Sequence, residues 1–321
     1  MKKTVSIASL GFASLMALAA PAHALNKRTW VSGTGVDQAG CGPIATPCRS
    51  LQFAHDQTSH GGEIDVKDSA GYGALTITKA ISIINDGNVA GVLATGNGNG
   101  ITINAGSGDD IVLRGLTIEG NGNGTNGIAS NTNGTLLIEN CTIADFGNHG
   151  VSFYPAGSAE LQVSGTSIRN VYVAAVYVAP SGQSAVTVRT AFDRVTTFNN
   201  GNGFFIDGRS LGSSARMRAS ISNSSTAYNI DRGSGVLGQG VVVASDNGGA
   251  TVTAAVSNTT IANSAIGVIR TTNAQSQMYV GRSTLTGNAS AIGASGIFSF
   301  GDNIVAGNTS NGNAFSAALP Q

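Results

Sequence analysis

Two pairs of oppositely charged residues in the second half of the chain are the first candidates for chemistry. Asp193 precedes Arg194, and Asp207 lies two positions before Arg209. On neighbouring turns of one fold, these carboxylate and guanidinium groups could form a catalytic cluster in which a single Asp or Arg is essential. Ion pairs between surface side chains are the commoner explanation for such groups. The four residues are therefore candidate catalytic residues that no second motif supports.

Aromatic residues close to these charges suggest binding instead of catalysis. Alternation in short apolar runs directs one residue inward and the next residue outward. The expected inward set is Ile128, Val151, Val176, Phe204, Val241 and Val268. The expected outward set is Ala129, Ser152, Tyr177, Phe205, Val242 and Ile269, with Tyr154 and Asp207 two positions further along their runs. A large apolar patch on a protein surface tends to mark a contact surface.

Three explanations of this outward stripe stay open. Aromatic faces stack on sugar rings, so the stripe could bind a polysaccharide. A loop of the same chain, 209–216 or 228–238, could fold over it, and a second protein chain could also cover it. The candidate binding residues are Tyr154, Tyr177, Phe205, Asp207 and Arg209.

A sequence repeat must position these residues. Three consecutive units of equal length, 111–135, 136–160 and 161–185, carry like residues at equal steps. The anchor columns are Leu113, Ile138 and Val163; Leu116, Cys141 and Thr166; and Ile118, Ile143 and Ile168. The last column continues at Thr197, Thr226, Ile261, Leu285 and Ile304. A period of this length is typical of a stacked, solenoid-like architecture.

Each unit contains two short alternating apolar runs, which indicate β-strands, and no run long enough for a helix. A unit of strands and bends that aligns like residues at each step predicts one turn of a parallel β-helix of about ten turns, with stacked positions about 4.8 Å apart. Glycine and asparagine separate the runs because both tolerate the left-handed backbone of tight bends. An asparagine ladder is expected at one corner, formed by Asn170, Asn199, Asn229, Asn263, Asn288 and Asn308.

The composition excludes several classes of function. The chain has 17 basic and 17 acidic residues, and only 11% of its residues are charged. Residues 1–24 have a basic start, a short apolar run and a small-x-small end, as a cleavable export signal does. Without the two lysines of that leader the count is 15 (17 − 2) against 17, a net charge of about −2. The sequence therefore carries no basic surface for nucleic acid or an anionic membrane, and the mature protein is expected in the periplasm or outside the cell.

The region after the leader is expected to close the N-terminal end of the coil. Cys41 and Cys48 flank a turn-forming loop, and an oxidising compartment favours a disulfide between them over a metal site. Cys141 falls in an inward column and is expected to be a buried free thiol. Residues 50–59 predict a short helix that Gly61 and Gly62 end. Such a helix would protect the open sheet edge of the first turn.

The sequence that contains these features resembles a known family. The segments TWVSGTGVDQAGCGPIATPCRSLQFAHDQTSHGGEIDV and GYGALTITKAISIINDG resemble the start of secreted parallel β-helix proteins of the pectin-lyase-like superfamily. The resemblance covers about residues 29–310 and concerns the fold. It implies a right-handed coil with three sheets per turn, in a superfamily that contains polysaccharide lyases, glycosidases and adhesins.

The catalytic sets of that superfamily are not reproduced. Glycosidases of the polygalacturonase type combine an Asp-Asp pair with a His-Gly, and this chain has Asp109-Asp110 and His149-Gly150. With turns as long as the repeated unit, Gly124 would lie beneath His149, so Asp110 would lie on another side of the coil. The two carboxyl groups of a glycosidase must flank one bond. We therefore expect Asp109 and Asp110 in a solvated loop and His149 at a bend.

A calcium site of the pectate lyase type would need several carboxylates on one outward face. The outward positions of the first run are instead hydroxyl residues, namely Thr117, Thr142, Ser167, Thr196, Ser225, Thr260 and Thr284. No metal or other cofactor is therefore expected.

The sequence thus predicts an all-β, right-handed parallel β-helix with a short N-terminal capping helix. Its expected parts are a signal peptide (1–24), an N-terminal strand, disulfide loop and helix (25–62), the coil (63–310) and a tail (311–321). The expected function is an exported binding or structural protein that contacts polysaccharide or another protein through one sheet. The alternative is a polysaccharide lyase or glycoside hydrolase with a divergent active site. Self-association through the exposed sheet face or the C-terminal end is also open.

Overall fold

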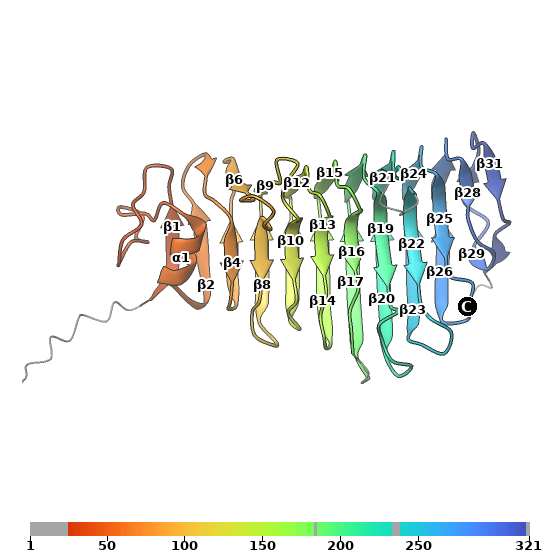
Figure 1. The fold of residues 1–321 in the computed structure, drawn as a ribbon, viewed down its shortest axis with the longest axis horizontal. Helices are drawn as coiled ribbons and strands as arrows, with labels where there is room; N and C mark the ends of the chain where they lie inside the picture. Colours follow the sequence, from red (N-terminus) through yellow and green to blue (C-terminus); the bar gives the residue numbers. More distant parts are fainter. Residues whose placement is uncertain (1–24, 183–184, 233–237, 319–321) are drawn as a thin grey trace, which may run out of the picture.

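The computed structural model describes residues 25–182, 185–232 and 238–318. In these residues the chain forms one α-helix and 32 β-strands, which wind into a long coil (Figure 1). The helix and the first strands lie at one end of the coil, and the last strands lie at the other. All strands pair in parallel within three sheets, so the expected right-handed parallel β-helix is confirmed.

The first and longest sheet, sheet A, has 12 strands. In order they are β1 (Asn26–Val31), β2 (Thr58–Val66), β5 (Ile81–Ile84), β8 (Asp110–Arg114), β11 (Thr135–Glu139), β14 (Ala159–Ser164), β17 (Thr187–Asp193), β20 (Arg216–Ser222), β23 (Thr251–Ser257), β26 (Ser276–Gly281), β29 (Ile297–Ser299) and β32 (Ser316–Ala317).

Sheet B and sheet C have ten strands each. Sheet B consists of β3 (Ala70–Gly71), β6 (Ala90–Leu93), β9 (Leu116–Glu119), β12 (Thr142–Ala144), β15 (Ser167–Arg169), β18 (Thr196–Phe198), β21 (Ser225–Ala227), β24 (Thr260–Ala262), β27 (Thr284–Thr286) and β30 (Ile304–Val305). Sheet C consists of β4 (Leu75–Ile77), β7 (Ile101–Ile103), β10 (Asn126–Ser130), β13 (His149–Phe153), β16 (Ala174–Val178), β19 (Asn202–Asp207), β22 (Gln239–Ala244), β25 (Ile266–Arg270), β28 (Ser290–Ile292) and β31 (Ser310–Gly312).

The core is built from the predicted inward columns. Ile143 pairs with Ile118 on one side and with Ile168 on the other, and all three side chains are fully buried. The inward set of sheet C, from Ile128 to Val268, is fully buried as well. Stacking of like apolar residues at each step removes their surface from water, which stabilises the fold by about 25 cal/mol for each Å² of apolar surface buried. The regular repeat therefore positions the core as the sequence predicted.

The last member of one predicted column is wrong by one position. Leu285 pairs with Val305, whereas Ile304 pairs with Thr284 and its side chain is exposed. The prediction placed Ile304 beside Leu285, but the residue there is Val305. The turn from β27 to β30 is therefore one residue longer than predicted. Because successive side chains point to opposite faces of a strand, this shift turns Ile304 outward.

The predicted asparagine ladder is two neighbouring columns at the corner between sheet B and sheet C. In one column, Asn199 donates to the side-chain oxygen of Asn170 at 2.8 Å, and both residues have a left-handed backbone. In the next column, Asn288 donates to Asn308 at 3.0 Å. Asn229 belongs to this second, more buried column, where it donates to Ser264. Asparagine amides thus satisfy backbone and side-chain groups from one turn to the next.

The N-terminal end is closed as expected, with one difference. Helix α1 (Leu51–Gln57) begins after Ser50, whose hydroxyl accepts a hydrogen bond from the Phe53 N–H, and it packs on β1, β2 and β4. The helix ends at Gln57, so Gly61 and Gly62 do not end it but lie inside β2. Strand β2 starts at Thr58 because the chain there joins β1 in sheet A.

The predicted cysteine chemistry is confirmed. Cys41 and Cys48 form a disulfide, and Cys141 is a buried free thiol. Burial raises the pKa of the Cys141 thiol to about 11, so this thiol stays protonated and unreactive at neutral pH.

The structure describes the two ends of the chain to different extents. The predicted signal peptide lies outside the described residues. At the other end, β31 and β32 continue the coil beyond the expected boundary at residue 310. No helix in the described ranges is long and apolar enough to cross a membrane.

Candidate functional site

Three aromatic side chains predicted to face outward lie together on sheet C. Tyr177 and Phe205 are directly paired residues of β16 and β19, and their ring centroids are 5.1 Å apart. The Tyr154 ring, at the end of the turn below, lies 5.7 Å from Tyr177 in an edge-to-face arrangement. All three side chains are half-buried. Aromatic pairs at such spacings attract each other beyond the area that they bury.

A carboxylate and a guanidinium group complete this aromatic cluster. The Tyr177 hydroxyl donates to Oδ2 of Asp207 at 2.9 Å. Arg209 donates to both oxygens of the same carboxylate, from Nε at 2.9 Å and from Nη2 at 2.7 Å, and its guanidinium carbon lies 5.8 Å from the centroid of the Phe205 ring. All five candidate binding residues of the sequence are therefore brought together. We call them the sheet C cluster.

The ionisation of the cluster follows from these contacts. Although burial alone would raise it, the pKa of Asp207 is lowered, because hydrogen bonds and the charge of Arg209 stabilise its carboxylate. Burial, together with the nearby Asp207 charge, raises the pKa of Tyr154 to about 12 and that of Tyr177 further. At neutral pH the cluster thus consists of two protonated phenols, one phenyl ring and one ion pair.

His149 lies against the sheet C cluster, and its position was predicted incorrectly. It is not a bend residue but the first residue of β13, is buried, and lies with its ring centroid 4.7 Å from that of Tyr177. Its Nδ1 has no hydrogen-bond partner among the described residues. Burial lowers the pKa of His149 to about 4, so the ring is neutral at pH 7.

The local sequence explains how a polar ring comes to lie there. A Cβ added at Gly150 would lie 2.4 Å from Cγ2 of the core residue Ile168, so the backbone at this point is pressed against the core. Val151 also points inward. With two consecutive positions committed to the core, the preceding His149 side chain is directed to the outer face, under the Tyr177 ring. The His-Gly pair was the available signal, but its direction depended on this packing.

The residue beneath His149 was also predicted incorrectly. His149 pairs with Asn126 and not with Gly124. In sheet A the same turn of the coil runs from Thr135 to Glu160, a longer step than that from Asn126 to His149. The bend before β13 is thus shorter than the bend before β10, and the loop after β13 compensates for this. The two turns have the same total length, so the repeat in the sequence did not show that their bends and loops differ in length.

The other Asp–Arg pair, Asp193 and Arg194, lies at the end of a sheet A strand and not beside the sheet C cluster. Asp193 is the last residue of β17 in sheet A, where it forms an ion pair with Arg194 and accepts hydrogen bonds from Ser222 and Asn223. Asp207 ends β19 in sheet C, at a different corner of the same turn. The predicted four-residue catalytic cluster is therefore wrong. Asp193 and Arg194 form a surface ion pair, as the commoner explanation held.

The Asp-Asp and His-Gly motifs remain apart. Asp109 accepts a hydrogen bond from the Gly106 N–H at 2.8 Å and bonds to Nε2 of His60 at 2.7 Å. Asp110 is not part of a loop but starts β8 of sheet A, whereas His149 lies in sheet C. The expectation that these residues do not form one acid/base site is supported by this separation.

The hydroxyl column on sheet B is formed as predicted. Thr142 pairs with Thr117 and with Ser167, and the column continues through Thr196 to Thr284 along one outward face. Within residues 25–182, 185–232 and 238–318, no group of three or more His, Cys, Asp or Glu side chains could hold a metal ion.

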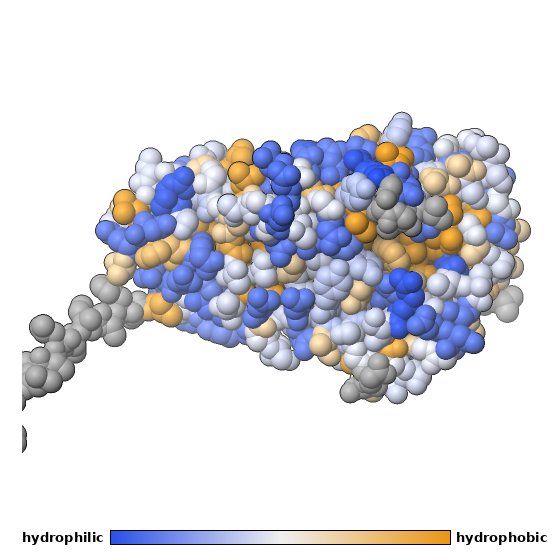
Figure 2. Space-filling model, viewed as in Figure 1, coloured by the Kyte–Doolittle hydropathy of each residue, from blue (hydrophilic) through white to orange (hydrophobic). Residues whose placement is uncertain are grey.

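The described parts of the two loops that could cover the stripe leave its aromatic rings half-buried, whereas Ala129, Ser152 and Val242, which were also predicted to face outward, are buried. Loop 209–216 contributes Arg209 over Phe205, while Leu211 and Ala215 turn into the core. The described part of the other loop lies at the corner between sheets B and C, where the Tyr228 ring packs at a tilt against Phe198 and Arg232 donates to the carbonyl of Asn199. In the space-filling view, apolar side chains gather at the level of the strands labelled β19 to β25 (Figure 2).

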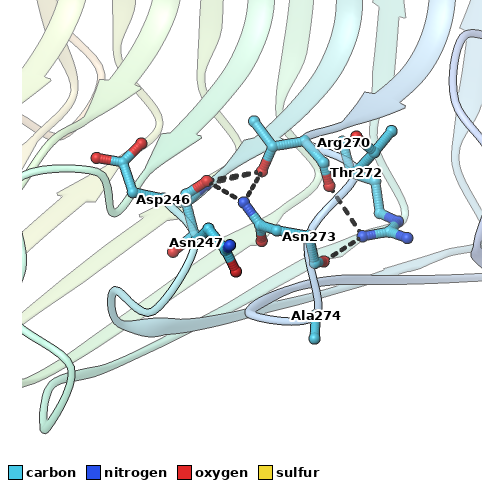
Figure 3. Close-up of a pocket in the computed structure, with 8 residues that line it drawn as sticks. Asp246, Asn247, Arg270, Thr272, Asn273 and Ala274 are labelled. Carbon is cyan, nitrogen blue, oxygen red and sulfur yellow. Dashed lines mark hydrogen bonds between the residues drawn. The ribbon is translucent and has the colours of Figure 1, made fainter.

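A cavity of about 760 Å³ lies at the same corner of the coil as Asp207 and Arg209, on the next two turns (Figure 3). It is lined by residues 245–247, which follow β22, and by residues 270–274, which are the last residue of β25 and the loop after it. In Figure 3 the Asp246 carboxylate points away from the Asn273 loop. Asp246 also raises the pKa of Arg209, after the larger effect of Asp207, so the cavity and the cluster are electrostatically connected.

Comparison with known proteins agrees with this architecture. No protein-family model matches the sequence, and no curated protein matches it. Among solved structures, pectate lyase Pel9A is 11% identical, with 92% of this chain and 80% of that chain covered and a TM-score of 0.51. The chain shares the fold of this pectate lyase. An alginate lyase from Paenibacillus sp. str. FPU-7 is 16% identical, with coverage of 83% and 94% and a TM-score of 0.49.

Proposed function

We propose that the protein is an exported glycan-binding protein and that the sheet C cluster is its binding surface. The observation that carries the proposal is the continuous contact of Tyr154, Tyr177 and Phe205 on an outward face, next to the Asp207–Arg209 pair. Half-exposed rings can stack on sugar rings, and a few fixed polar groups beside them orient a ligand. The leader-like residues 1–24 support a location outside the cytoplasm.

The alternative is a polysaccharide lyase or glycoside hydrolase, and the fold shared with a pectate lyase is compatible with it. The ionisation of the cluster favours binding over catalysis. A general base needs a pKa near the working pH, whereas the pKa of Tyr154 is raised to about 12 and that of Tyr177 further. Asp207 already accepts bonds from Tyr177 and Arg209, so its oxygens are occupied.

The test is retention of the full chain on immobilised polysaccharides, with the double variant Tyr177→Ala/Phe205→Ala compared with the wild type. The proposal predicts that the double variant loses retention while it stays folded, with a melting temperature lowered only by the loss of the ring contacts and of the Tyr177–Asp207 hydrogen bond. A matched control is Tyr279→Ala/Phe298→Ala, which removes a stacked pair of rings, also 5.1 Å apart, from sheet A. This control is expected to be retained like the wild type.

Two results would count against the proposal. A double variant that melts several degrees lower and is still retained would assign the rings to packing under their own loop. Release of sugar products from the retained polymer, lost on substitution of Asp207 or Arg209, would favour the enzymatic alternative.

A further inference from the structure

The charged groups around the cluster and the cavity differ in how far they are committed to partners. Arg209 is held by both oxygens of Asp207. Arg270, at the cavity, donates from Nη1 to the carbonyls of Thr271, Asn273 and Ser276 at 2.7–2.8 Å and from Nε to that of Ser295. Both guanidinium groups therefore serve contacts within the protein.

Asp246 is the exception. No hydrogen bond or ion pair joins its carboxylate to another group in the described parts of the chain, and Figure 3 shows it pointing away from the Asn273 loop. The rest of the lining is uncharged apart from Arg270: Ser245, Asn247, Thr271, Thr272, Asn273 and Ala274. The two carboxylates, Asp207 and Asp246, thus balance the two guanidinium groups, and the region carries no excess positive charge.

The strand register connects the cluster to the cavity. Phe205 pairs with Val242, and Val242 with Ile269, so apolar residues continue from the aromatic rings across β22 and β25; Val242 is buried, and Phe205 and Ile269 are half-buried. Asp207 pairs with Ala244, so Arg209 and Asp246 occupy equivalent positions on neighbouring turns, each two positions further on. From β16 to β25 there are three steps of about 4.8 Å, which give a surface about 14 Å long.

We propose that the ligand of this surface is an uncharged glycan, which lies along the coil axis over Tyr177 and Phe205 and reaches the cavity beside Asp246. This inference rests on the proposed glycan-binding function. Sugar hydroxyls can donate to the Asp246 carboxylate and accept from the remaining N–H groups of Arg209. A uronate polymer would instead bring carboxylates close to Asp246, and like charges repel. Arg209 is already paired with Asp207, so the region has no excess positive charge to hold such a polymer.

The experiment measures the affinity of the full chain for two sets of polymers. One set is uncharged (β-glucan, galactomannan and xyloglucan), and the other is anionic (polygalacturonate and alginate). We expect binding to an uncharged polymer that hardly changes with salt, because no ion pair with the ligand forms. Asp246→Asn should weaken this binding about tenfold, which corresponds to about 1.4 kcal/mol. Asp110→Asn, which removes an exposed carboxylate from sheet A, should leave it unchanged.

Each result has one meaning. If the protein binds a uronate polymer in a salt-sensitive way, and Tyr177→Ala/Phe205→Ala abolishes this binding, the ligand is not uncharged but the binding surface is correct. Unchanged affinity in Asp246→Asn overturns the role of the cavity. Binding that survives the double variant, or no binding to either set, overturns the proposed function itself and this inference with it.

Discussion

The two Asp–Arg pairs of this chain have similar sequences and different surroundings. The Asp193 side chain is 32% exposed and pairs with Arg194, which is 66% exposed, at the end of a sheet A strand. The Asp207 side chain is only 7% exposed and also accepts the Tyr177 hydroxyl. The difference arises from what the neighbouring turns stack beside each pair: Ser222 and Asn223 beside Asp193, and aromatic rings beside Asp207. The same pair is solvated in one place and part of a built surface in the other.

This comparison predicts that, of the two regions, only the one around Asp207 loses stability at mildly acidic pH, because His149 lies there. The pKa of His149 is lowered to about 4 by burial, against 6.5 for the exposed ring. Protonation below pH 6.5 therefore favours the unfolded chain. The stabilising contribution is present above pH 6.5 and is lost as the pH falls to about 4, and it amounts to about 3 kcal/mol at most.

Urea unfolding as a function of pH measures this effect. His149→Phe keeps a ring in the cluster and should flatten the decline between pH 6.5 and 4. The part of the decline that remains is assigned to His55, because burial lowers the pKa of this residue as well. His60→Gln, at an exposed histidine, serves as the control and should follow the wild type. An equally steep decline in His149→Phe would contradict the neutral, buried state of His149.

A smaller effect separates the two carboxylates. Asp207→Ala leaves the Tyr177 hydroxyl and Arg209 without their partner, and we expect a loss of about 2 kcal/mol in the free energy of unfolding. Asp193→Ala removes an exposed partner of an exposed arginine and should leave the urea midpoint unchanged. Equal midpoints for the two variants at pH 7 would show that the two pairs do not differ energetically.

The smallest predicted effect concerns one hydrogen bond. Tyr177→Phe removes the hydroxyl that donates to Asp207 and should cost about 1 kcal/mol. Tyr154→Phe removes a hydroxyl for which the described residues provide no hydrogen bond, and it should be neutral. Thermal melts of the two variants, at the same pH, distinguish them. A reversed order would mean that the Tyr177–Asp207 bond does not stabilise the cluster.

The sequence predicted the parts of the molecule that depend on regular spacing. Ile118, Ile143 and Ile168 could be placed in one buried column because their steps are equal and one face of the strand must be buried. The outward contact of Tyr177 with Phe205 followed from the same register.

The errors lie where loop lengths or packing intervene. Ile304 was misplaced because the last turn is longer by one position than the column required, and His149 because unequal bends gave the same total length. The difference between Asp193 and Asp207 was not predictable from residue types. It depends on which corner each strand end reaches, and therefore on how three sheets close around the core.

The central claim is that the sheet C cluster is the surface that binds a glycan. Its most direct test is a crystal structure of the full chain with the shortest oligosaccharide of the polymer that the protein retains. The account predicts electron density for a sugar ring in contact, at about 4 Å, with the ring of Tyr177 or Phe205. Density for the sugar on sheet A or sheet B alone, with the sheet C cluster bare, would contradict it.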